Sequence, residues 1–321
     1  MRRRWWLLVL GFGLLVLPMV LGSYGRTIFI FIFFYAYLGQ AWNIVGGYAG
    51  QLSLGHAAFV GVGAYVSTVL AMTWGLTPWI GMFVGGLVAA LLGALVGFLG
   101  FRFGLRGFTF VVLTLALAEI CRLLTLHTDA LGGALGLFIT FTGDAWQFQF
   151  QDNRAYYYVA LGLMLVAVGI VAALERTRLG ASLVAIREDE EASEALGIDT
   201  MRAKMAAMIL SAFLTGVGGT FYANYLFSIQ PSSIFGIPLS VDILLRPIVG
   251  GSGTLWGPIL GSFILSPLAE ASRTVFARGG LSGVHLIVYG GLLVAVVLFL
   301  PQGAYPALRG ALAVRARRRR A

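Results

Sequence analysis

The stretch WNIVGGYAGQLSLGHAAFVGVGAY, residues 42–65, decides how this chain folds. Apolar runs lie on both sides of it, but its GGYAG motif interrupts helix propensity, and the polar residues Gln51, Ser53 and His56 follow. Non-helical backbone cannot face lipid, because no water is present there to bond its N–H and C=O groups. The stretch is therefore expected to be buried in protein or to line a water-filled cavity.

The composition around this stretch is typical of a helical membrane protein. The 321 residues are 59% apolar and only 11% charged, whereas soluble domains have about 25% charged residues. Several runs are long enough to cross a bilayer as a helix, and they lack the alternation of a membrane β-barrel. The apolar stretches lie near residues 5–22, 27–45, 57–73, 79–101, 108–126, 155–174, 205–227, 238–250, 255–272 and 284–300.

These stretches predict an all-α, polytopic membrane protein with about 8–10 transmembrane helices, some of them broken, and ten crossings is our preferred count. The stretch 238–250 is too short to cross alone and contains Arg246 and Pro247, so a broken or tilted helix is expected there. Within residues 81–100 the glycines and alanines are spaced so that helix backbones can approach closely. The first stretch is interpreted as a retained membrane span.

Basic residues predict the orientation. Arginines gather at both ends of the chain, so the positive-inside rule places both termini in the cytoplasm. Six predicted spans then place the loop 175–204 in the cytoplasm, with seven of the chain's 13 acidic residues. Arg106 falls on the same side, and the segment 127–154 on the opposite side. We expect a transmembrane domain over residues 1–304, including that loop, and a basic cytoplasmic tail over residues 305–321.

Several functions are disfavoured by what the sequence lacks. The net charge of +9 does not indicate a nucleic-acid partner, because the arginines lie where the positive-inside rule expects them. No GxxxxGK[ST] motif occurs, so ATP hydrolysis by that machinery is not expected. Three histidines and the single Cys121 suggest neither a metal cluster nor an internal disulfide. We predict no cofactor and no catalytic site, and we expect Glu119 to pair locally with Arg122.

The first candidate site is the segment Asn43–His56. Interrupted helices of this kind offer free backbone donors and acceptors to a polar solute. The alternative is a turn between two spans whose polar groups hold the helices together. The candidates for the solute path are Asn43, Gly50, Gln51, Ser53, Gly55 and His56.

The second candidate site is REDEEASEALGID, Arg187–Asp199. Its pattern predicts one short amphipathic helix over Arg187–Ile198, with Glu190 on the solvent face. Acidic residues suit its first turn, and Gly197 followed by an apolar residue is typical of a left-handed C-terminal cap. The residues expected to share the small apolar face are Ala185, Ala192, Ala195 and Leu196. This face favours docking in a partner's groove over a solvated connecting helix.

A third feature is GGSGTLWGP, Gly250–Pro258, which predicts a break between two helices. This feature lies in one of three stretches that resemble the LivH/LivM permeases, the membrane subunits of branched-chain amino acid ABC importers. They occur in the same order and span residues 42–261, and the long segment 127–154 resembles the LivM type. Arg246-Pro247 departs from the more apolar sequence of that family. The three stretches are WNIVGGYAGQLSLGHAAFVGVGAYV, LGASLVAIREDEEASEALGIDTMRAKMAAMILSAFLTGVGGTFYA and DILLRPIVGGSGTLWGPILGSF.

The resemblance implies a permease subunit in a bacterial cytoplasmic (inner) membrane. The implied partners are a paralogous permease subunit, two ATP-binding subunits, a periplasmic solute-binding protein and membrane lipid. The ATPases would grip the second candidate site through Arg187, Glu188, Glu191, Ala192, Ala195, Leu196 and Gly197. A urea or short-amide permease of the same family is an alternative. A stand-alone channel or secondary carrier needs no ATPase dock, and a membrane enzyme needs a catalytic constellation, so both are disfavoured.

Overall fold

The computed structural model describes residues 5–278, 290–291 and 303–307. Its α-helices are α1 Trp5–Val20, α2 Ser23–Asn43, α3 His56–Trp74, α4 Pro78–Arg102, α5 Phe108–Leu126, α6 Asn153–Leu174, α7 Arg178–Glu188, α8 Glu190–Ala195, α9 Thr200–Leu226, α10 Pro231–Ile234, α11 Ile237–Gly250 and α12 Gly257–Arg278. One π-helical turn, η1 Ile44–Tyr48, follows α2 directly. The short elements are η2 Asp129–Leu131, η3 Gly133–Leu135, η4 Ala145–Gln147, β1 Leu137–Phe138 and β2 Ser228–Ile229.

The helices coincide with the apolar stretches of the sequence. Every stretch predicted up to residue 272 overlaps a helix over most of its length, and the stretch 284–300 lies outside the described residues. Across the part of the chain that the structure describes, seven helical segments are long and apolar enough to cross a membrane. The prediction of an all-α, polytopic membrane protein is therefore confirmed.

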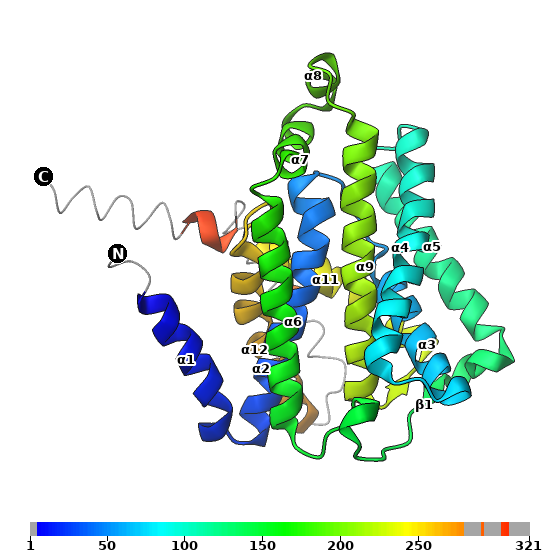
Figure 1. Cartoon of the computed structure of the whole chain (residues 1–321), viewed down its shortest axis with the longest axis vertical. Helices are drawn as coiled ribbons and strands as arrows, with labels where there is room; N and C mark the ends of the chain where they lie inside the picture. Colours follow the sequence, from blue (N-terminus) through cyan, green and yellow to red (C-terminus); the bar gives the residue numbers. More distant parts are fainter. Residues whose placement is uncertain (1–4, 279–289, 292–302, 308–321) are drawn as a thin grey trace, which may run out of the picture.

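The two ends of the helix bundle differ. Figure 1 shows α7 at one end of the bundle, beside the tip of α9, and α8 beyond it, whereas β1 and the loops around it lie at the other end. Arg106, in the α4–α5 connection, contacts Glu190 at 3.4 Å and so belongs to the α8 end. At the opposite end β1 pairs antiparallel with β2, Leu137 with Ile229. Loop 175–204 and segment 127–154 therefore lie at opposite ends of the bundle, as their predicted placement on opposite sides requires.

Small residues allow α3, α4 and α9 to pack with their backbones close together. A Cβ on Gly63 of α3 would overlap the carbonyl oxygen of Gly216 in α9. A Cβ on Gly216 would in turn lie 2.6 Å from that of Ala89 in α4. This close approach is the role predicted for the glycines and alanines of residues 81–100. It makes α9 the central helix against which α3 and α4 are fixed.

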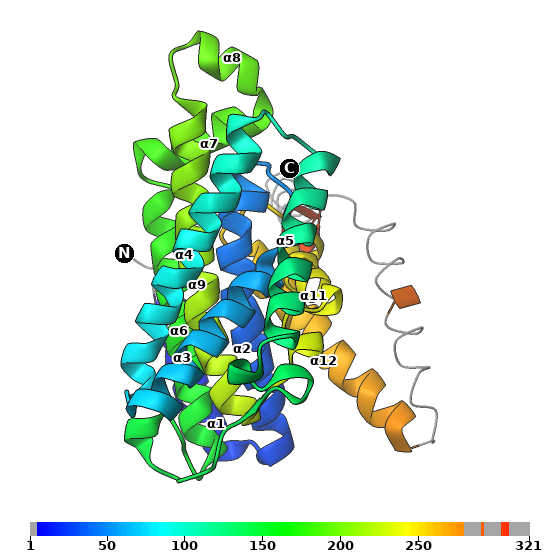
Figure 2. The ribbon, with the colours of Figure 1, turned by 90° about the vertical axis from the view of Figure 1, so that its right-hand side faces the viewer.

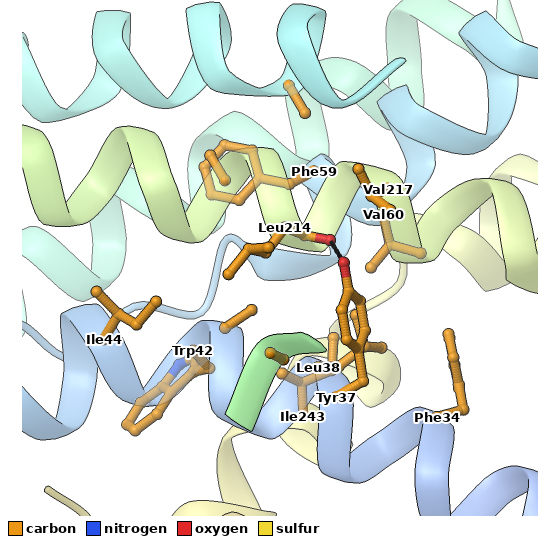
Figure 3. Close-up of a cluster of buried hydrophobic side chains, with 14 of the residues drawn as sticks. Phe34, Tyr37, Leu38, Trp42, Ile44, Phe59, Val60, Leu214, Val217 and Ile243 are labelled. Carbon is orange, nitrogen blue, oxygen red and sulfur yellow. Dashed lines mark hydrogen bonds between the residues drawn. The ribbon is translucent and has the colours of Figure 1, made fainter. Parts of the chain in front are cut away.

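Aromatic and aliphatic side chains fill the space between α2 and α9. Figure 3 shows Tyr37 pointing from α2 toward α9, where its hydroxyl donates a hydrogen bond of 2.5 Å to the carbonyl oxygen of Leu214. Phe34, one turn earlier on α2, stacks on Phe221 with ring centroids 5.4 Å apart. The cluster is completely buried, so α2 is held in place directly before its π-helical turn.

The segment after α9 contains a helix break just before the stretch 238–250, whereas α11 continues through Arg246 and Pro247 without a break. α10 and α11 are separated by Phe235 and Gly236, and together they extend over Pro231–Gly250. α11 ends at Gly250, and α12 begins at Gly257 after the glycine-rich loop that the sequence predicted. Figure 2 shows α11 and α12 on the side of α2 that faces away from α4. Three helices, α2, α11 and α12, therefore form one side of the bundle.

Candidate functional site

The first candidate site begins where α2 changes its helical pitch. After Asn43 the chain forms the π-helical turn η1, in which the N–H of Ala49 bonds the carbonyl of Ile44 at 3.3 Å. Such turns interrupt the regular hydrogen-bond ladder and occur often at functional sites. The chain then runs without helix from Ala49 to Gly55, and α3 starts at His56. The sequence prediction of an interrupted helix is confirmed.

His56 lies at the centre of a buried polar network. Its Nε2 is 2.9 Å from the hydroxyl oxygen of Ser211 in α9, and its Nδ1 is 3.2 Å from that of Ser53. Ser211 in turn donates to the carbonyl oxygen of Ala41 at 2.6 Å. The indole N–H of Trp42 donates to the carbonyl oxygen of Ser53 at 2.8 Å. The network therefore ties the end of α2, the loop and α3 to the centre of α9.

Asn43 joins this segment to the glycine-rich loop before α12. Its amide nitrogen donates to the carbonyl oxygen of Thr254 at 3.0 Å, and its amide oxygen accepts from the N–H of Gly253 at 2.8 Å. One turn earlier, Gln40 donates to the carbonyl oxygen of Leu255 at 2.6 Å. Asn43 is completely buried, so its two bonds satisfy loop backbone groups that would otherwise need water as a partner.

The other residues predicted for a solute path are also packed against protein. Gln51 is buried and donates to the carbonyl oxygen of Ala49 at 3.3 Å. Gly50 is exposed, has φ of +67°, and faces the Arg187 side chain. A Cβ on Gly55 would lie 2.6 Å from the carbonyl oxygen of Thr114 in α5. Four of the six predicted residues, Asn43, Ser53, Gly55 and His56, therefore brace neighbouring elements, whereas Gln51 bonds within its own loop and Gly50 faces α7.

The second candidate site differs in shape from its prediction. The sequence predicted one helix over Arg187–Ile198, but the chain forms α7, which ends at Glu188, and a separate α8 that begins at Glu190. Asp189 between them is extended, with φ of −157° and ψ of 110°, and its carboxylate accepts the N–H of Ala192 at 2.9 Å. Aspartate favours this N-terminal cap over a helix interior, which explains the break. Ala185 therefore belongs to α7 and shares no face with Ala192.

Both ends of α8 follow their predictions. Glu190 and Glu191 lie in its first turn, where the helix dipole favours acidic residues. At the other end Gly197 has φ of +84°, which glycine adopts without strain. The N–H of Ile198 bonds the carbonyl of Ser193 at 3.1 Å, and the N–H of Gly197 that of Glu194 at 2.9 Å. The predicted left-handed cap is confirmed.

The small apolar face of α8 is open. Ala192, Ala195 and Leu196 are exposed, and Leu196 is 84% exposed. Ser193 is the buried residue of this helix, and its hydroxyl donates to the carbonyl oxygen of Asp189 at 2.7 Å. α8 therefore turns an alanine–leucine surface outward, away from its own chain.

The prediction that Glu190 lies on the solvent face is wrong. Its side chain is only 12% exposed and forms an ion pair with Lys204 of α9, whose side chain is 4% exposed. Arg106 approaches the same carboxylate at 3.4 Å, and the Lys204 ammonium lies 5.0 Å from the centre of the Phe101 ring. A helical wheel could not reveal this contact, because Lys204 lies on α9 and Arg106 in the α4–α5 connection. The ion pair anchors α8 to α9.

Arg187 connects the two candidate sites. From the end of α7 its guanidinium donates to the carbonyl oxygen of Gly47, in η1, at 3.0 Å, and it pairs with Glu188 at 2.8 Å. The same guanidinium contacts the backbone at Gly253, which Asn43 binds. The α7–α8 segment, the π-helical turn and the glycine-rich loop are thus joined through one side chain.

Several residues of this arrangement were missed by sequence analysis. Ser211 and Ser240 are small hydroxyl residues inside apolar helices: Ser211 bonds His56, and Ser240 accepts the N–H of Ala57. Thr114 accepts the N–H of Leu54 at 3.1 Å. The sequence offered one sign of them: each is a small polar residue within a membrane span, and such a residue needs a hydrogen-bond partner wherever it is buried. Among the described residues no group of three or more metal-ligating side chains occurs.

Comparisons with known proteins identify the family. A family model described as "Branched-chain amino acid transport system / permease component" matches residues 26–297. The chain is 30% identical to the high-affinity branched-chain amino acid transport system permease protein LivM of Escherichia coli (strain K12), over 86% of this chain and 68% of that protein. It is 22% identical to the LivH protein of Salmonella typhimurium, over 84% and 90%. No solved structure matches this chain.

A more distant relative is named for a different solute. The L-arabinose ABC transporter permease protein AraH of Azospirillum brasilense is 24% identical, over 78% of this chain and 72% of that protein. Since the family model covers most of the chain, this protein belongs to the family of branched-chain amino acid transport system permease components.

Proposed function

We propose that this chain forms one half of the translocation pore of a bacterial ABC importer that carries branched-chain amino acids into the cytoplasm. Its family membership and its likeness to LivM support this solute class. The chain has no phosphate-binding loop for ATP, so the energy comes from two separate ATP-binding subunits. It performs no chemistry itself. A paralogous permease subunit completes the pore, a periplasmic solute-binding protein delivers the solute, and membrane lipid surrounds both.

The exposed face of α8 is the observation that carries this proposal. Ala192, Ala195 and Leu196 form a small apolar surface at the end of the bundle, and a helix face of this kind fits a groove on a partner. The ion pair between Glu190 and Lys204 fixes α8 to the bundle, so force applied to α8 reaches α9. A solvated linker would need neither the exposed leucine nor the buried anchor.

Arg187 provides the path from the docking helix to the membrane spans. It bonds η1 at Gly47 and contacts the loop at Gly253, which precede α3 and α12. When the ATPases draw together, movement of α7 therefore displaces the backbone at the ends of α2 and α11. In this proposal Asn43, Gln51, Ser53, Gly55 and His56 transmit that displacement between helices.

The proposal places the α8 end of the bundle in the cytoplasm of a bacterial inner membrane. The basic residues of this end support it under the positive-inside rule. They are Arg102, Arg106, Arg176, Arg178, Arg187, Arg202 and Lys204. Both termini face the cytoplasm in this arrangement, and residues 1–304 form the permease domain. The basic tail proposed for residues 305–321 lies outside the described residues from 308 onward.

Reconstitution tests the transport function. The chain is coexpressed with its partner permease and ATPase, and the complex is placed in liposomes with ATP on the α8 side. We expect uptake of leucine, isoleucine or valine that depends on ATP and on the solute-binding protein. Uptake of none of these amino acids would contradict the solute class, and uptake without ATPase subunits would contradict the importer class.

Thiol labelling tests the orientation. In a Cys121→Ala background, Leu196→Cys places a thiol at an 84% exposed position on α8. We expect an impermeant reagent to label it only from the cytoplasmic side. Ala134→Cys, exposed at the opposite end of the bundle, is the matched control and labels only from outside. The reverse pattern would overturn the orientation and the ATPase docking.

A further inference from the structure

A charged cavity lies between α2, α11 and α12, on the side of the bundle away from α4. It has a volume of about 60 Å³, and both acidic and basic side chains line it. Its charged side chains are Asp242, Arg246 and Glu270, and its apolar wall includes Ile28, Phe31 and Tyr35. None of these residues belongs to the polar network around His56.

The cavity extends along α2 from Ile28 to Tyr35, and its inner end, at Tyr35 and Arg246, lies deep in the predicted membrane region. Tyr35 is twelve residues after the start of α2 at Ser23 and eight residues before its end at Asn43. At ~1.5 Å per residue these distances are about 18 Å and 12 Å along the helix. Charged side chains at such depth are costly in lipid, and they commonly mark the path of a charged solute or ion.

Arg246 is held in a fixed position. Its side chain is 1% exposed, and its guanidinium carbon lies 4.3 Å from the centre of the Tyr35 ring. Close packing supports the stem, because a Cβ on Gly39 would lie 3.3 Å from the Cβ of Arg246. Asp242, one turn earlier on α11, approaches the guanidinium at 3.8 Å and keeps 30% of its side chain exposed.

The exposed carboxylate shows which way the cavity opens. Asp242 and Glu270 are both accessible in part from outside the chain. Asp242 has Arg246 as its partner within the chain, and a partly exposed ion pair in the hydrocarbon region is more stable toward a watery path or another protein than toward lipid. This side of α2, α11 and α12 therefore faces the solute path or the partner permease, where the halves of a pore meet.

We propose that this cavity binds the headgroup of a zwitterionic α-amino acid during translocation. Arg246 donates hydrogen bonds to the α-carboxylate, and Asp242 and Glu270 accept hydrogen bonds from the α-ammonium. Ile28, Phe31 and Tyr35 contact the start of an apolar side chain. The proposal rests on the proposed function and adds a site to it. A phospholipid headgroup with phosphate and ammonium carries the same charges, but headgroups stay at the bilayer surface.

The experiment measures ligand binding to the purified complex without its solute-binding protein, by saturation-transfer NMR. The probes are leucine, 3-methylbutylamine, which lacks the carboxylate, and 4-methylpentanoate, which lacks the ammonium. We expect leucine to bind about tenfold or more tightly than either. Arg246→Met should remove the advantage of leucine over the amine, and Asp242→Asn should reduce its advantage over the acid. A structural role alone would not produce this split.

Controls separate the possible failures. Glu119→Gln removes a half-exposed carboxylate on α5, away from the cavity, and should leave the leucine preference unchanged. Equal binding of the three probes to the native complex, or native selectivity in both variants, overturns the inference.

If Arg246→Met does not assemble, the Asp242→Asn variant alone decides, because the Asp242 side chain reaches the surface. Leucine uptake without the selectivity overturns this site only, whereas transport restricted to uncharged solutes overturns the proposed function as well. Competition by phosphatidylethanolamine would assign the cavity to lipid.

Discussion

The segment Asn43–His56 and the helix α8 are both polar interruptions in an apolar chain, yet they differ in what covers them. The first is enclosed: Asn43 and His56 are completely buried, and they bond the glycine-rich loop and α9 respectively. The second lies beyond the bundle with Leu196 84% exposed. A polar residue whose partners lie in its own chain is part of the architecture, whereas an apolar face left exposed is available to another subunit.

The comparison also shows how each region is held. Neutral hydrogen bonds fix the enclosed segment, and a buried ion pair between Glu190 and Lys204 fixes α8. Arg187, in α7 directly before α8, donates to the carbonyl oxygen of Gly47 in the enclosed segment and pairs with its neighbour Glu188. The predictions below test whether the enclosed region supports stability while the exposed one supports coupling.

The largest effect is expected for Ala192→Arg on the open face of α8. A bulky charge there must clash or be buried unpaired in the partner's groove, at a cost of several kcal/mol. Uptake by the reconstituted complex should fall by about 100-fold or more, and copurification of the ATPases should be lost. Ala134→Arg, exposed at the opposite end, is the control and should transport normally. Normal transport by both variants would remove the docking role of α8.

The next effect is expected for Glu190→Gln, which leaves Lys204 buried without its carboxylate partner. Breaking a buried ion pair costs about 3 kcal/mol or more, so the free energy of unfolding in detergent should fall by about that amount. Glu191→Gln is the matched control: its side chain is 82% exposed, its contact with Arg106 is 3.6 Å, and its effect should stay below about 1 kcal/mol. Equal effects of the two variants would show that α8 is not anchored through Glu190.

Asn43→Ala should lower stability by about 2 kcal/mol, because the N–H of Gly253 and the carbonyl of Thr254 lose their bonds inside the protein. Thermal unfolding of the detergent-purified complex measures the change. Gln147→Ala, exposed at the other end of the bundle, should change the unfolding temperature little. If Asn43→Ala instead abolished uptake with stability intact, the enclosed segment would contact solute and the contrast with α8 would fail.

The smallest effect is expected for Gly50→Ala. Its φ of +67° costs a non-glycine residue about 1 kcal/mol, and the new Cβ would lie 2.8 Å from Cγ of Arg187. A double-mutant cycle with Arg187→Ala separates the two contributions, because truncation of Arg187 removes the crowding but not the backbone strain. Strict additivity would show that the enclosed and exposed regions do not communicate at this contact.

Much of the fold could be predicted because each membrane span is a local property. The apolar stretch 108–126 coincides with α5, and the cap at Gly197 follows from one glycine and the apolar residue after it. The division between α7 and α8 was missed, because an aspartate at position 189 is compatible both with the N-terminal cap of a new helix and with the interior of one longer helix. Helical periodicity assigned Glu190 to the wrong surface, because its partner Lys204 lies on a different helix.

The sequence by itself determined the class of protein, the positions of its helices and the interruption after Asn43. These depend on hydrophobicity, glycine and charge along the chain, which act over one or two helical turns. Only the tertiary structure decided that His56 bonds Ser211, that Asn43 holds the loop at Gly253, and that Arg246 lies beside Tyr35 in a charged cavity. A buried polar group takes its partner from whichever helix packs against it, and that packing depends on the shapes of all the spans together.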